Sequence, residues 1–91
     1  MGNSYSLKID LVADSGAGDV LIQCVSRIFG WPSATKFLNP GTYTVEFSTE
    51  RGLLTLSATS TRDKVGYELE AVLSDEQDAV LLRNAVVGLF P

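Results

Sequence analysis

The chain has 91 residues, a hydrophobic fraction of 45% and a formal net charge of −4, with a single cysteine and no histidine. This length predicts one domain over residues 1–91, and the lone cysteine excludes an internal disulfide. Only seven basic residues are scattered along the chain, which disfavours nucleic acid as a partner, and no apolar run or signal sequence predicts a membrane or secreted location, so we expect a cytoplasmic protein.

The first elements in chain order are a strand and a helix. Residues 4–13 alternate between apolar and polar side chains, which predicts a half-buried strand. A turn, DSGAGD, then leads into a predicted helix over residues 19–29, and Ser15 or Asp19 is expected to cap it. Gly30 is expected to end this helix at a positive φ, with Trp31 more typically folding back over the core.

The next segment, PSATKFL at residues 32–38, is expected to be a short second helical piece that starts at Pro32 and ends at the turn NPG. From there the apolar period is two, which predicts three strands over residues 42–48, 53–60 and 67–73. The turn TERG places Gly52 where a positive φ is expected. Ser74 and Gln77 fit a capping box, which predicts a last helix that runs almost to Pro91.

The predicted order is therefore β-α-(short α)-β-β-β-α. Three consecutive alternating strands favour an antiparallel meander with one solvent-exposed face. The first strand completes a mostly antiparallel four-stranded sheet. Helices on one face of that sheet would cover its apolar side. The sequence thus predicts a two-layer α+β sandwich.

The sequence contains few of the parts that catalysis needs. Histidine, the commonest general base and metal ligand, is absent. Cys24 falls on the apolar face of the first helix and has no base in reach, so a buried structural role is expected. Asp75, Glu76 and Asp78 lie at a helix start, where the helix dipole alone favours acids. We predict no catalytic, metal or cofactor site and expect a protein that is not an enzyme.

One loop leaves a ligand-binding alternative open. Gly16 and Gly18 lie between a strand and a helix start, where backbone N–H groups can bind an anion. The flanking Asp14 and Asp19 would repel a phosphate, and a lone G-x-G is a weak pattern. A small-molecule or anion binder at the Asp14–Asp19 loop is therefore kept as an alternative function.

The last helix offers the most specific candidate for a contact surface. Its broad apolar face is expected to pack on the sheet and contains Ala79, Leu82, Ala85, Val86, Leu89 and Phe90, with Leu81 at the margin. Val80 and Val87 lie away from that face, on a narrow stripe bordered by Glu76, Arg83 and Asn84. Such a stripe is typical of a helix-mediated contact, and a two-fold homodimer is the simplest form of it.

Two further surfaces could bind a protein. Trp31 and Phe37 follow the first helix and form a second candidate patch, because tryptophan is enriched at interface centres. Glu46, Glu68 and Glu70 are expected on the wet face of the sheet, where they would attract a basic partner.

These surfaces favour a small acidic protein-protein interaction module. One specific form is an inhibitor or immunity-type binder of a basic protein surface. The alternative from the same surfaces is a structural subunit of a larger homo- or hetero-oligomeric assembly.

Overall fold

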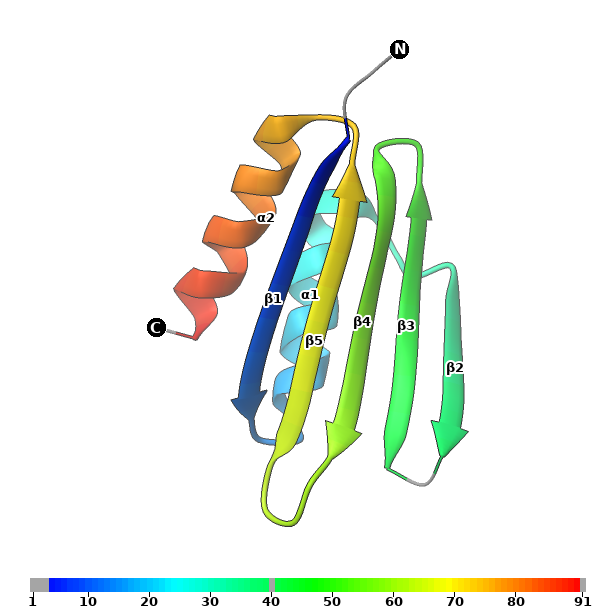
Figure 1. Cartoon of the computed structure of the whole chain (residues 1–91), viewed down its shortest axis with the longest axis vertical. Helices are drawn as coiled ribbons and strands as arrows, with labels where there is room; N and C mark the ends of the chain where they lie inside the picture. Colours follow the sequence, from blue (N-terminus) through cyan, green and yellow to red (C-terminus); the bar gives the residue numbers. More distant parts are fainter. Residues whose placement is uncertain (1–3, 40, 91) are drawn as a thin grey trace.

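The computed structural model describes residues 4–39 and 41–90. Its elements are β1 (Tyr5–Ala13), α1 (Ala17–Phe29), β2 (Ala34–Asn39), β3 (Thr42–Thr49), β4 (Gly52–Ser60), β5 (Val65–Leu73) and α2 (Glu76–Leu89). The strands form one antiparallel sheet in the order β1-β5-β4-β3-β2 (Figure 1). Both helices pack on the same face of that sheet, which confirms the α+β architecture.

The sheet has five strands, so the predicted four-stranded sheet with a short second helix is wrong. The segment expected to be helical, PSATKFL, instead supplies most of β2, which pairs with β3 from Ala34↔Glu46 to Asn39↔Thr42. Pro32 lies two residues before this strand rather than at the start of a helix. Thr35 and Phe37 are residue types that favour strands, and pairing with β3 satisfies backbone groups that a single helical turn would leave open.

The first strand lies beside the last one. β1 pairs with β5 along its whole length, from Tyr5↔Leu73 to Ala13↔Val65. The strands β2 to β5 form a meander of neighbours. The two edges of the sheet are therefore β1, at the start of the chain, and β2, in its middle.

The core lies between the inner face of the sheet and the two helices. Leu21 and Val25 of α1 meet Leu82 and Val86 of α2 in this layer, and all four are buried. On the strands, burial alternates as the sequence predicted. The fully buried side chains of largest volume are Phe47, Leu21, Leu54, Leu56, Leu73, Leu82, Val25, Val45 and Val86.

The helix starts differ from the prediction in both cases. Gly16 is the N-cap of α1 and no side chain caps that helix, so the expected cap by Ser15 or Asp19 is wrong; Asp19 lies in the first turn. The N-cap of α2 is Asp75, whose carboxylate accepts the Gln77 N–H, and not Ser74. The Ser74 hydroxyl instead donates to the Arg51 carbonyl at 3.2 Å.

Arg51, in the turn between β3 and β4, joins three elements. Its Nε and Nη2 donate to the Asp78 carboxylate at 3.0 Å each, and its Nη1 donates to the Ile28 carbonyl at 2.7 Å. The guanidinium also lies 4.4 Å from the centre of the Phe29 ring. The hydrogen bond from Arg51 holds the pKa of Asp78 below its usual value. We call these four residues the Arg51 clasp; it fastens the hairpin tip to the end of α1 and the start of α2.

Candidate protein-binding surfaces

The helical layer does not cover the whole sheet. In Figure 1, α1 lies behind β5 and its neighbours and α2 lies beside β1, whereas no helix lies behind β2. The consequence is visible at Phe37, which points to the inner face of the sheet in register with Tyr43 and is nevertheless 80% exposed. The inner face of the sheet is therefore uncovered at this strand.

A hollow follows the uncovered side of α1. Near the start of the helix it has a volume of about 360 Å³ and is lined by Ser15, Asp19, Ile22, Thr35, Phe37, Tyr43 and Val45. A second hollow of about 340 Å³ continues along the helix and is lined by Gln23, Ser26, Arg27 and Trp31. We call the surface formed by these two hollows the α1–β2 furrow.

The furrow has an apolar floor and charged ends. The rings of Phe37 and Tyr43 lie 6.1 Å apart at a 48° tilt. Burial raises the pKa of the Tyr43 hydroxyl, and the nearby Tyr67 and Asp19 raise it further. Asp19 borders one hollow and Arg27 the other, so the furrow offers a negative group at one end and a positive group at the other.

Trp31 lies at the open end of the furrow. The prediction that it folds back over the core is wrong, because 79% of it is exposed. Gly30 does adopt the expected positive φ, at 98°, and its N–H donates to the Ser26 carbonyl. The chain then leaves α1 towards the edge of the sheet to begin β2, which carries Trp31 away from the core.

The stripe on α2 borders the other edge of the sheet. Val80 and Val87 are 51% and 53% exposed. Glu76, Val80 and Arg83 line a hollow of about 340 Å³ together with Ser4 and the first residues of β1, Tyr5 to Leu7. Asn84 is exposed as well. The structure thus brings Glu76, Val80 and Arg83 together beside β1.

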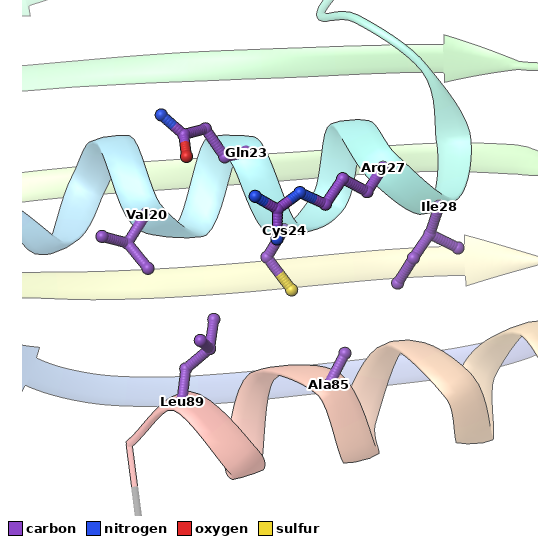
Figure 2. Close-up of a pocket in the computed structure, with 7 residues that line it drawn as sticks. All are labelled: Val20, Gln23, Cys24, Arg27, Ile28, Ala85 and Leu89. Carbon is purple, nitrogen blue, oxygen red and sulfur yellow. The ribbon is translucent and has the colours of Figure 1, made fainter.

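The apolar face of α2 is narrower than predicted. Leu89, which was assigned to that face, is 42% exposed, and Leu81 at its margin is 50% exposed. Leu89 and Ala85 point instead towards α1, where they line a groove of about 340 Å³ with Val20, Cys24 and Ile28 (Figure 2). Cys24 is partly buried in this groove, and burial raises the pKa of its thiol, which opposes a nucleophilic role.

The open face of the sheet carries the predicted acidic residues. The register places Glu68 between Asp10 and Ser57, and Glu70 between Lys8 and Thr55. Glu46 lies on the same face, beside Thr55.

Lysines partly balance this face. Lys8 lies 3.7 Å from Glu68, and Lys36 lies 3.1 Å from Glu46. Exposed apolar residues, including Leu53 and Val72, share the surface.

The loop between β1 and α1 is held by internal contacts. Lys64 donates to the Asp14 carboxylate at 2.8 Å, which lowers the pKa of Asp14. The Tyr67 hydroxyl donates to the carbonyls of Asp14 and Ser15, and the Ala17 N–H donates to the Asp14 carbonyl. Among the described residues, no group of three or more acids and cysteines is placed to hold a metal ion.

Comparison with known families and proteins adds no further evidence on function. No family model, curated protein or solved structure matches this chain. No helix within residues 4–39 and 41–90 is long and apolar enough to cross a bilayer.

Proposed function

We propose that the protein is a protein-binding domain without catalytic activity and that the α1–β2 furrow is its main binding surface. The observation that carries this proposal is the exposure of Trp31 and Phe37, 79% and 80%, the highest values among the exposed large hydrophobic residues that the structure describes. Aromatic residues are enriched at the centres of protein interfaces, where burial of each ring contributes strongly to affinity. Two such side chains on one furrow favour a protein partner.

The shape of the furrow indicates the kind of segment it binds. Helices cover the apolar face of a sheet as one packed layer, and α1 occupies that layer on one side of the furrow only. A partner element beside α1 would cover Phe37 and Tyr43 and complete the layer over β2 and β3. Asp19 and Arg27 at opposite ends of the furrow would favour an amphipathic segment with a basic and an acidic end.

The open face of the sheet supports a second candidate, an inhibitor-type binder of a basic surface. Asp10, Glu46, Glu68 and Glu70 gather there, against Lys8 and Lys36. Binding through this face would weaken as salt increases, because exposed charges are screened. Changing Glu46, Glu68 and Glu70 to Gln together should then reduce the association rate at low salt. An unchanged rate would remove this candidate.

The two remaining alternatives have less support. A ligand at the Asp14–Asp19 loop would have to compete with Lys64 for Asp14 and with the Asp14 carbonyl for the Ala17 N–H. A structural subunit would form large closed or open assemblies, which sedimentation distinguishes from a monomer or dimer.

The test compares partner capture by three purified forms of the chain. The wild type is immobilised beside Trp31→Ser/Phe37→Ser, which removes both exposed rings. Val12→Ser/Leu53→Ser is the matched control, because these residues are 71% and 51% exposed but lie on the open face. We expect the wild type and the control to retain the same proteins and the furrow variant to lose them. Equal capture by all three forms would contradict the furrow as the binding surface.

A further inference from the structure

The edge of β2 has free backbone groups at defined positions. The Ser60 N–H donates to the Gly41 carbonyl, so this position at the start of β3 faces β4. The Glu46 carbonyl accepts the Ser33 N–H, and the Ser48 N–H donates to the Ser33 hydroxyl, so these even-numbered residues of β3 face β2. In an antiparallel pair, residues alternate between the two sides.

The register then shows which residues of β2 point outward. Glu46 pairs with Ala34, and Thr44 pairs with Lys36, so the backbone groups of Ala34 and Lys36 face β3. Those of Thr35 and Phe37 consequently face away from the sheet. An edge strand with exposed N–H and C=O groups is a template for another strand.

We propose that a second copy of the chain binds this edge, with the two β2 strands antiparallel and a two-fold axis at Thr35. The inference deepens the proposed function, because it names a partner for the same β2 surface, and it rests on that function only in its use of Trp31 and Phe37. Thr35 would lie opposite Thr35 of the second copy, and the two five-stranded sheets would become continuous.

Charge complementarity selects this register. With the axis at Thr35, Lys36 lies opposite Ala34 of the second copy, and Glu46 of that copy lies next to its Ala34. Within one copy, Lys36 already lies 3.1 Å from Glu46. The small side chain of Ala34 leaves room for the lysine to lie between that carboxylate and Glu46 of the second copy, so the two-fold axis would join both lysines and both glutamates in one charge network. A shift of the axis to Lys36 would place the two lysines opposite each other, which is unfavourable.

The aromatic residues support the same arrangement. Directly opposed residues in an antiparallel pair lie on the same face, so Phe37 would lie opposite Ser33 of the second copy. Trp31 precedes Ser33 by two positions, which brings it to the flank of the incoming Phe37. Neither α1 nor α2 covers this side of β2 (Figure 1), so the rings have room to meet across the axis. The dimer would therefore cover the two most exposed aromatic residues of each copy.

The segment is too short to support open-ended growth of the sheet. Pro32 precedes the strand, and the register shifts between Phe37 and Asn39. Two-fold pairing uses the β2 edge of both copies, and α2 lies beside β1 at the other edge (Figure 1). The expected product is a closed dimer.

Sedimentation velocity over a concentration series tests the proposal. The wild type should show a monomer–dimer equilibrium, and Thr35→Pro should abolish it, because proline removes an edge N–H that the fold does not use. Asp10→Pro is the matched control at the other edge. The Ser74 N–H donates to the Arg51 carbonyl, and continuing the alternation through Glu68↔Asp10 makes the Asp10 N–H an edge group as well. This variant should dimerise like the wild type.

A charge reversal gives a second readout that does not depend on backbone changes. Lys36→Glu should raise the dimer dissociation constant by at least about tenfold, because each of two contacts becomes repulsive. The double variant Lys36→Glu/Glu46→Lys should restore it to within about threefold of the wild type.

Three outcomes would overturn the proposal. They are a wild type that stays monomeric throughout the series, a dimer that survives Thr35→Pro, and a dimer that dissociates with Val80→Glu/Val87→Glu, which would place the interface on α2. If the wild type is a monomer and captures proteins that the Trp31→Ser/Phe37→Ser variant does not, the dimer proposal fails and the proposed function stands. If the wild type dimerises through β2 but captures no other protein, the dimer proposal stands and the furrow is not a binding surface for other proteins.

Discussion

The two edge strands of the sheet have different surroundings. On β1, the inner residues Leu7, Ile9 and Leu11 are half-buried and pack against the core. On β2, the inner residues Thr35 and Phe37 are exposed. The difference lies in the helices, because α2 lies beside β1 whereas neither α1 nor α2 covers β2 (Figure 1). The placement of the helices therefore decides whether the inner face of an edge strand becomes core or stays exposed.

The Arg51 clasp acts on the covered side alone. It links the hairpin tip to α1 and α2, whose positions define the core. The furrow side has no comparable fastening among the described hydrogen bonds. Substitutions on the two sides should consequently differ in their effect on folding, and four measurements test this.

The largest effect is expected at Leu82, which is fully buried on α2. Leu82→Ala removes apolar contacts and leaves a cavity, so it should lower the free energy of unfolding by about 2–5 kcal/mol. Urea denaturation of the variant beside the wild type measures the change. Val80→Ala on the exposed side of the same helix is the control, with an expected change below about 0.5 kcal/mol. Similar losses at both positions would mean that α2 does not pack as described.

Loss of the clasp should cost less. Arg51→Met keeps much of the aliphatic length but removes the hydrogen bonds to Asp78 and Ile28 and the contact with Phe29, so the free energy of unfolding should fall by about 1–2 kcal/mol. Solvent limits the effect, because the Arg51 side chain is 42% exposed. Arg62→Met, in the exposed turn after β4, is the control. Equal stability of the two variants would contradict a structural role for the clasp.

The Arg51 clasp also makes the free energy of unfolding depend on pH. The pKa of Asp78 lies below its ordinary value of 3.8, chiefly because Arg51 donates to its carboxylate. A lowered pKa contributes stability above the unfolded value, and this contribution is lost as the pH falls through the lower folded value.

The measurement compares wild type and Asp78→Asn by urea denaturation from pH 7 to 2. Their difference in unfolding free energy should be constant near neutral pH and shrink below about pH 4. Glu76→Gln in the same helical turn controls for loss of an acid. A difference that does not change with pH would show that the ion pair contributes nothing.

The smallest effect on stability is expected at β2, the edge strand that the helices leave uncovered. Phe37→Ala removes a large ring, but 80% of that residue is already exposed, so monomer stability should change by less than about 1 kcal/mol. Denaturation at low concentration measures this without a contribution from self-association. A loss comparable to that of Leu82→Ala would mean that Phe37 belongs to the core, and the contrast between the two edges would disappear.

Much of the fold follows from periodicity in the sequence. The strands at β1, β3, β4 and β5 and both long helices were predicted, because each has a repeat long enough to identify. β2 was not, because PSATKFL is too short for a period, and Pro32 is compatible with the start of a helix or of an extended segment. Its strand state depends on pairing with β3, which is a tertiary effect.

The candidate surface was predictable in its residues and less so in its arrangement. Trp31 and Phe37 can be singled out by residue type. A tryptophan after a glycine cap, however, can also fold back and cover the core. Only the path of the chain from α1 to the far edge of the sheet decides its exposure. Arg51 carried no sequence signal, because an arginine in a tight turn is ordinary and its partner Asp78 lies 27 positions away.

The pairing of β1 with β5 has a consequence for the order of folding. Each of the other strand pairs joins neighbours in the chain, whereas β1 and β5 pair from opposite ends of the chain. Contacts between residues far apart in sequence close large loops, and their entropic cost delays them. During synthesis, β1 and α1 must wait for β5 to emerge. We therefore expect the meander to form the folding nucleus and Ile9→Val in β1 to speed unfolding while leaving the refolding rate nearly unchanged; a slower refolding rate would place β1 in the nucleus.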